Sequence, residues 1–173
     1  GPDRQVYSLD FRSDGAQLAT MCSDGMIHLW DSATGQEQQV LESKGNFLVR
    51  FCPDGKHLFA GGRGFDQIRL WDLETGRQLA EFGNQNPVFA VYEANPDFSR
   101  DGRRLAVNSG EFVRLLDSDS GTQLALAGPH PATVSLVKYA PGGRQLASVT
   151  WRIPSTEARH PHDIHLWDTD TGQ

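Results

Sequence analysis

Short stretches in which apolar and polar residues alternate run along the whole chain. They are rich in Val, Ile, Leu, Phe and Tyr, and Asp-Gly or Thr-Gly pairs separate them. Such pairs favour tight turns between antiparallel strands, and alternation is typical of strands. No segment keeps the apolar period of about 3.6 residues that marks an amphipathic helix. The pattern predicts an all-β protein made of short strands joined by hairpins.

The expected strands fall into four groups. The first group has strands at Val6–Phe11, Ala16–Cys22, Met26–Trp30 and Gln36–Leu41. The second has strands at Phe47–Phe51, His57–Ala60, Gln67–Trp71 and Gln78–Phe82. The third has strands at Val88–Glu93, Arg104–Asn108, Phe112–Leu116 and Gln123–Leu126. The fourth has only three, at Val134–Tyr139, Gln145–Thr150 and Ile164–Trp167. We therefore expect four antiparallel sheets, the last lacking its outer strand.

An internal repeat explains this grouping. Each group holds an alternating strand followed by an Asp and, four residues later, a Gly: IHLWDSATGQ, IRLWDLETGR, VRLLDSDSGT and IHLWDTDTGQ. The Asp residues are Asp31, Asp72, Asp117 and Asp168, so successive copies lie 41, 45 and 51 residues apart. A turn motif precedes each copy: RSDGAQLA, CPDGKHLF, SRDGRRLA and PGGRQLA. Two motifs that repeat together predict one repeat domain over residues 1–173, with repeats at about 1–41, 42–83, 84–127 and 128–173.

At these motifs the sequence resembles the WD-repeat family of β-propellers, whose blades are four-stranded antiparallel sheets. The resemblance covers essentially the whole chain. Repeat three departs from it, with Leu116 in place of the Trp and an insertion, Ala94–Asp97, ahead of its turn. Rings of this type usually have about seven blades, so the resemblance implies that four blades form an open arc. Both end faces of the arc would expose apolar surface, to be covered by further blades or by a second copy in a homodimer.

In many such blades a His, a Ser or Thr, an Asp and a Trp form a buried hydrogen-bonded set. The resemblance implies this set in repeat four. Its members are His130 before the first strand, Ser148 in the second, and Asp163 and Trp167 at the two ends of the third. We expect these four residues to form a structural network without chemistry.

A hydrolytic alternative uses the same residues. Ser148, His130 and Asp163 are the three residue types of a serine-hydrolase triad. A nucleophilic serine needs an exposed, strained turn, and the chain has no G-x-S-x-G elbow. A buried serine bonded to its histidine is the simpler interpretation.

A metal-binding alternative uses the segment ARHPHDIHLW. Its His160, His162, Asp163 and His165 are residue types that bind Zn²⁺. The repeat itself accounts for His165, which occupies the position of His28 in repeat one. The other two histidines fit a surface loop, so we predict no metal site and no cofactor.

The connection WRIPSTEARHPH lengthens the link between the second and third strands of repeat four. Residues of the types enriched at interaction hot spots occur here and in the equivalent segment GGRGFDQ of repeat two: Trp151, Arg152, Arg159, His160, Arg63 and Phe65. In the family this face most often receives ligands, so the resemblance implies a protein or peptide partner there. The alternative is a variable loop without a partner.

Charge and cysteine content narrow the class of partner. The net charge is −6 and the basic residues are scattered singly, which argues against nucleic acid or an anionic membrane surface as a ligand. No apolar stretch reaches the roughly 18 residues of a membrane span. Two cysteines exclude a disulfide scaffold and fit a reducing compartment, so we expect a cytoplasmic location. The start at Gly1-Pro2 has no signal segment and is compatible with a native start or a protease scar.

The sequence thus predicts a non-catalytic protein-interaction scaffold that is part of a larger protein or assembly, and no enzyme. Two alternatives stay open. One is a metal-dependent or hydrolytic enzyme that uses the histidine-rich loop of repeat four, and the other is a purely structural segment.

Overall fold

The computed structural model describes residues 4–43, 48–61, 68–82, 96–151 and 163–171. Every regular element in these ranges is a β-strand, and they contain no helix that could cross a membrane. The strands are β1 (Val6–Phe11), β2 (Gln17–Cys22), β3 (Met26–Asp31), β4 (Glu37–Glu42), β5 (Leu48–Phe51), β6 (His57–Gly61), β7 (Ile68–Asp72), β8 (Gln78–Phe82), β9 (Asp97–Phe98), β10 (Arg104–Ser109), β11 (Phe112–Asp117), β12 (Gln123–Ala127), β13 (Thr133–Tyr139), β14 (Gln145–Trp151) and β15 (Ile164–Asp168).

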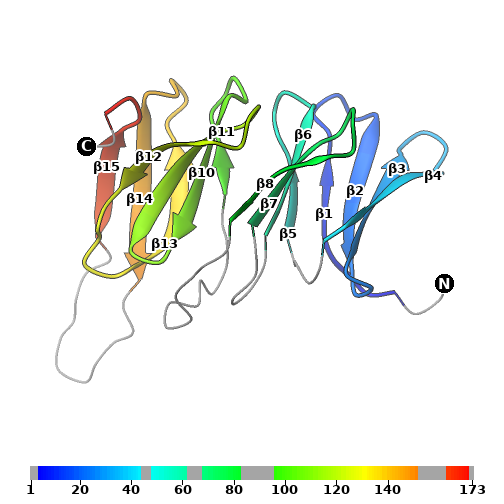
Figure 1. Cartoon of the computed structure of the whole chain (residues 1–173), viewed down its shortest axis with the longest axis horizontal. Helices are drawn as coiled ribbons and strands as arrows, with labels where there is room; N and C mark the ends of the chain where they lie inside the picture. The colour runs from blue at the N-terminus through cyan, green and yellow to red at the C-terminus, as the bar shows by residue number, and fades with distance from the viewer. Residues whose placement is uncertain (1–3, 44–47, 62–67, 83–95, 152–162, 172–173) are drawn as a thin grey trace.

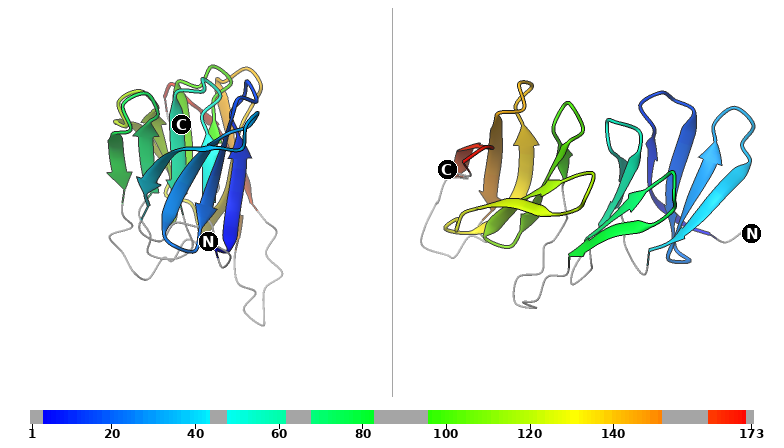
Figure 2. Two further views of the ribbon diagram at one scale, coloured as in Figure 1. Left: turned by 90° about the vertical axis from the view of Figure 1, so that its right-hand side faces the viewer. Right: turned by 45° about the horizontal axis from the view of Figure 1, so that its top comes forward.

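Strands that follow one another in sequence pair into four sheets, here called blades one to four. Their orders are β1-β2-β3-β4, β5-β6-β7-β8, β9-β10-β11-β12 and β13-β14-β15. Figure 1 shows the blades side by side in a row that does not close, with the two chain ends at opposite ends of the row. Figure 2 shows the same row from two other directions. The prediction of all-β blades in an open arc, with three strands in the described part of the last, is confirmed.

The inner strand of blade three differs from the prediction. The expected strand at Val88–Glu93 lies outside the described residues, and the structure instead pairs β9 with β10, Phe98 opposite Leu105. The stretch Asp97–Gly102 has the same spacing as Asp10–Gly15 in blade one, with an aromatic residue second and Gly last. The distance to the turn at Gly102 therefore determines the position of β9 in the sequence. Its first residue, Asp97, belongs to the segment that we interpret as an insertion.

The Asp of each repeated motif caps the turn that follows it. Asp31 Oδ1 accepts hydrogen bonds from the backbone N and the Oγ1 of Thr34, both at 2.8 Å. Asp168 Oδ1 accepts the same two bonds from Thr171, at 2.9 and 3.1 Å. The motifs of blades two and three have the equivalent backbone bond. These caps explain why the Asp and the Gly repeat together.

Apolar side chains between neighbouring blades form three cores. The core between blades one and two includes Ala19, Met21, Ile27, Leu29, Val49, Phe51 and Trp71. The next includes Phe59, Leu70, Leu105, Val107 and Leu116, and the third Val113, Leu115, Val137, Tyr139 and Leu146. Leu116, which replaces the Trp of the motif, is 1% exposed, so this departure preserves apolar packing. Each blade is thus stabilised mainly by its neighbours.

A carboxylate on the inner strand joins one blade to the next at two junctions. Asp10 Oδ2 accepts a hydrogen bond from the backbone N of Phe51 at 2.8 Å. Asp97 Oδ2 accepts the equivalent bond from Tyr139 at 2.7 Å, and its other oxygen pairs with Lys138 Nζ at 2.6 Å. These bonds satisfy backbone N–H groups at the open edge of an inner strand.

Candidate functional site

Three of the four expected network residues meet inside blade four. Trp167 Nε1 donates a hydrogen bond to Ser148 Oγ at 2.7 Å, and the Ser148 hydroxyl donates to His130 Nε2 at 2.7 Å. His130 Nδ1 donates to the backbone carbonyl of Glu111, in blade three, at 2.9 Å. His130 is 3% exposed and Ser148 is completely buried. With this assignment of protons, every polar side-chain atom of the three residues has a partner.

Asp163 does not join this network, which corrects the expected set of four. Asp163 is exposed, and the described residues include no hydrogen bond between its carboxylate and His130. Its backbone carbonyl accepts a bond from Thr150 N at 3.1 Å. The physical reason is that the carbonyl of Glu111 already accepts the Nδ1 proton of His130, so the ring needs no carboxylate.

The network is suited to packing and not to catalysis. Burial lowers the pKa of His130, an effect that its bond to Glu111 only partly opposes, so the ring is neutral near pH 7. Ser148 donates its proton to this ring but has no surface that a substrate could reach. A hydrolytic nucleophile must contact its substrate, so this geometry does not support the triad interpretation.

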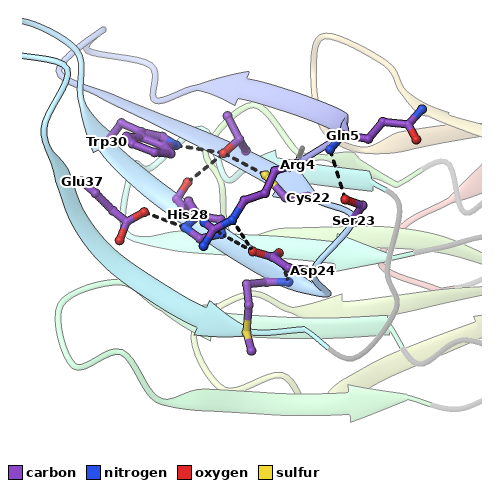
Figure 3. A network of polar contacts seen from close by, with 10 residues as sticks. Arg4, Gln5, Cys22, Ser23, Asp24, His28, Trp30 and Glu37 are labelled. Atoms are coloured by element: carbon purple, nitrogen blue, oxygen red, sulfur yellow. Dashed lines mark hydrogen bonds and ion pairs between the residues drawn. The ribbon is translucent and has the colours of Figure 1, made fainter. Parts of the chain in front are cut away.

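Blade one repeats half of this network and adds a second histidine site (Figure 3). Trp30 Nε1 donates to Thr20 Oγ1 at 2.8 Å, as the Trp of blade four does to its serine. His28 lies opposite Thr20 in the sheet and is 2% exposed. Its Nδ1 is 2.7 Å from Glu37 Oε2, and its Nε2 is 3.1 Å from Asp24 Oδ2. Both nitrogens of this buried ring therefore face carboxylates.

Arg4 completes the polar cluster around His28. Its Nη1 is 3.2 Å from His28 Nε2, and its Nε is 3.1 Å from Asp24 Oδ2. Figure 3 shows the guanidinium of Arg4 beside the imidazole and the carboxylate. The cluster thus places one permanent cation against the ring of His28 and the carboxylate of Asp24.

A third polar cluster lies where blade two meets blade three. Cys52 Sγ donates to the backbone carbonyl of Gly102 at 3.1 Å, and His57 Nδ1 is 2.9 Å from Asp54 Oδ2. Burial raises the pKa of the Cys52 thiol to about 12. The thiol therefore stays protonated at neutral pH and acts as a hydrogen-bond donor between two blades.

A polar cleft of about 610 Å³ separates the turns of blades three and four. Its lining includes Arg100, Arg104, Arg144, Asp101 and Asp170. Arg104 Nη2 pairs with Asp170 Oδ1 at 2.7 Å, and this bond links the two blades. The cleft offers charged groups of both signs to a ligand.

Apolar side chains are exposed on the outer faces of the first and last blades. On blade one, Leu9 and Phe11 are 54% and 55% exposed, because the alternate residues of β1, Ser8 and Asp10, face blade two. On blade four, Ile164 and Leu166 are each 69% exposed. Exposed apolar patches of this kind mark interaction surfaces.

The expected partner-binding residues cannot be placed on these surfaces. Arg63, Phe65, Arg152, Arg159 and His160 lie outside the described residues. Trp151 ends strand β14, but its side chain also lies outside them. The loop surface therefore stays a prediction from sequence.

The sequence interpretation missed three residues that bind these histidines. Glu111 acts through a backbone carbonyl, which no sequence pattern marks. Glu37 reaches His28 across a β-bulge in the pairing of β3 with β4. The pairing of the third and fourth strands has a bulge at the same place in blades two and three, so this feature repeats from blade to blade. No repeated motif marks Arg4, which precedes β1.

A model of the family described as "WD domain, G-beta repeat" matches residues 1–31 of the chain. The relatives found include "Cell division cycle 20.1, cofactor of APC complex" of Arabidopsis thaliana, 26% identical over 96% of this chain and 34% of that protein. "WD repeat-containing protein 82" of Drosophila melanogaster is 25% identical over 99% of this chain and 53% of that protein. "Protein groucho" of the same organism is 28% identical over 86% and 21%.

Among solved structures, "Kuenenia stuttgartiensis Hydrazine Synthase" matches with a TM-score of 0.75 and 14% sequence identity. The match covers 96% of this chain and 47% of that one. At this identity the likeness concerns the fold alone. The chain spans about half or less of the length of these relatives and of this structure.

Proposed function

Because the chain consists of four blades of the WD-repeat β-propeller type, we propose that it is a non-catalytic scaffold that binds protein or peptide partners within a larger protein or assembly. The name of one relative supports this proposal, because the Arabidopsis protein is called a cofactor of a complex. The fold alone does not determine a ligand. The support from this chain comes from its end faces.

The observation that carries the proposal is a difference between two copies of one segment. The segment Ile-His-Leu-Trp-Asp occurs in blades one and four. In blade one, Ile27 and Leu29 are completely buried against blade two. In blade four, the equivalent Ile164 and Leu166 are each 69% exposed. Side chains selected for a blade junction thus face solvent in the isolated chain, so we infer that another blade or subunit covers them.

The ligand surface and location belong to the same proposal. We assign partner binding to the loop surface that contains Trp151, Arg152, Arg159, His160, Arg63 and Phe65. A net charge of −6 argues against nucleic acid and membrane lipid as partners. Two buried free cysteines, Cys22 and Cys52, favour a cytoplasmic location.

A random-peptide phage library selected on the folded chain tests ligand binding. We expect enriched peptides whose binding is lost when residues 152–162 are replaced by Asp-Gly, with the Tm nearly unchanged. A variant with Arg100→Ala and Arg144→Ala in the polar cleft is the matched control and should bind as the wild type does. Equal binding by the loop variant would contradict the assigned surface, and failure to enrich any peptide would contradict the peptide-binding role.

A fluorophosphonate probe tests the hydrolytic alternative in the same protein. We expect no labelling of Ser148, because its hydroxyl is buried and bonded to His130. Labelling of Ser148 in the folded chain would show that the scaffold assignment is wrong.

A further inference from the structure

Three side chains of metal-binding types converge on the β2–β3 hairpin of blade one. Cys22 ends β2, Asp24 lies in the turn and His28 lies in β3. One donor atom of each lies within 4.8 Å of the others. Cys22 and His28 are 4% and 2% exposed, so their donor atoms are held in a packed environment. Thiolate, carboxylate and imidazole are the donors that Zn²⁺ takes in proteins.

The hydrogen bond between His28 and Glu37 orients the ring as in a metal site. With Nδ1–H donating to Glu37 Oε2 at 2.7 Å, the lone pair of the neutral ring is on Nε2. This nitrogen faces Asp24 and Arg4. Histidines that bind metals commonly donate their other N–H to a carboxylate, which fixes the tautomer and the ring plane.

The guanidinium of Arg4 already stabilises His28 Nε2 and the Asp24 carboxylate, the two proposed metal ligands that face each other. With this tautomer, the lone pair of His28 Nε2 and the carboxylate of Asp24 are two acceptors 3.1 Å apart, which repel each other. Arg4 relieves the repulsion by donating to both, through Nη1 at 3.2 Å and Nε at 3.1 Å. Its side chain is 48% exposed, so this guanidinium can move aside at low cost.

We propose that blade one binds one Zn²⁺ ion through Cys22 Sγ, the Asp24 carboxylate and His28 Nε2, with a water molecule as the fourth ligand and Glu37 as the carboxylate that orients His28. Zn²⁺ bonds of about 2.0–2.3 Å place tetrahedral donors about 3.3–3.8 Å apart. Asp24 Oδ2 and His28 Nε2 are already 3.1 Å apart, and all three donor atoms lie within 4.8 Å of one another. A shift of about 1 Å or less between Cys22 Sγ and the other two donors therefore closes the site.

The charge balance of the site supports Zn²⁺ as its ligand. Coordination releases the Cys22 thiol proton to solvent, so the ion meets a thiolate and two carboxylates. Three negative charges are balanced by Zn²⁺ together with the guanidinium of Arg4. The site therefore becomes neutral when the ion binds and Arg4 stays nearby.

The cluster at the junction of blades two and three provides a matched control. Cys52, Asp54 and His57 also place donor atoms within 4.8 Å of one another. Its thiol, however, already donates to the carbonyl of Gly102 at 3.1 Å and stays protonated. The thiol of Cys22 donates only a long hydrogen bond, to Thr20 Oγ1 at 3.8 Å, and the described residues show no carbonyl bonded to it.

Cobalt and zinc titrations of the reduced 173-residue chain test the proposal. We expect one Co²⁺ per chain, a near-ultraviolet thiolate-to-cobalt absorption band, and displacement of Co²⁺ by Zn²⁺. Cys22→Ser and Cys22→Ala should both lose the band, whereas Cys52→Ser should keep it. Glu37→Gln should weaken Zn²⁺ binding about tenfold or more, the effect of losing a carboxylate behind a metal-bound histidine.

Circular dichroism and thermal melts establish that each variant is folded. Absence of a thiolate band in the wild type would overturn the proposal, and so would a band that persists in folded Cys22→Ser. A band that disappears in Cys52→Ser would place the ion at the other cluster. Zn²⁺ binding lost only in a His160→Ala/His162→Ala variant would place it in the loop of repeat four, and it would equally overturn the proposal.

Discussion

At the scale of single residues, the buried network of blade four depends on one hydroxyl. Ser148 accepts the only N–H of the Trp167 ring and donates to His130. Replacing Ser148 with Ala leaves Nε2 of the buried His130 and Nε1 of the half-buried Trp167 without partners, which costs about 1–3 kcal/mol. We expect Ser148→Ala to lower the free energy of unfolding by this amount, measured by urea denaturation.

Asp163→Ala is the control for this prediction. Its carboxylate is exposed and outside the network, so the expected change is within about 0.5 kcal/mol. A loss as large as that of Ser148→Ala would show that the carboxylate takes part in the network after all.

At the scale of elements, the turns after the third strands make stability depend on pH. Hydrogen bonds from the Thr34 hydroxyl and backbone lower the pKa of Asp31, and those from Ser120 lower that of Asp117. A folded-state pKa below the unfolded one stabilises the fold fully above the ordinary carboxyl pKa of about 4, and this stabilisation is lost as the pH falls through the lower folded value. We expect the urea concentration at the unfolding midpoint to decrease as the pH is lowered below about 4. The fall should be smaller in an Asp31→Asn/Asp117→Asn variant, whose amides keep an acceptor but cannot titrate. If the urea midpoint of the variant decreased with pH as steeply as that of the wild type, these carboxylates would not have the proposed role.

The turn between β9 and β10 packs closely against blade two at Gly102, a position with no room for a side chain. Gly102 has a φ of +70°, and a Cβ there would lie 2.9 Å from the backbone N of Asp54 in blade two. Gly143, in the equivalent turn of blade four, has a φ of +72° and nothing within 4 Å of such a Cβ.

Gly143→Ala therefore measures backbone strain alone, about 1–2 kcal/mol. We expect Gly102→Ala to cost at least about 1 kcal/mol more, because the neighbouring backbone must also move. Chemical denaturation of the two variants gives the difference directly. Equal losses would mean that blades two and three are not closely packed at this turn.

At the scale of the whole molecule, the exposed end faces should control self-association. Ile164→Lys with Leu166→Lys removes apolar surface from the outer face of blade four without touching a core. We expect this variant to bind less hydrophobic dye and to associate less in light scattering, with a Tm close to that of the wild type. A large drop in Tm would show that these side chains are already packed in the isolated chain.

The sequence by itself determined the turns, the number of blades and the strands, apart from the inner strand of blade three, where the structure has β9 (Asp97–Phe98). Hairpins form between residues close in sequence, so the spacing of Asp31 and Gly35, and of its copies, fixes each sheet locally. Only the tertiary structure decided which copy of the Ile-His-Leu-Trp segment is buried, because burial depends on whether another blade follows. It also decided that the carbonyl of Glu111, and not Asp163, receives the proton of His130. That choice depends on how blade three packs against blade four, and a contact between separate sheets leaves no periodic pattern in the chain.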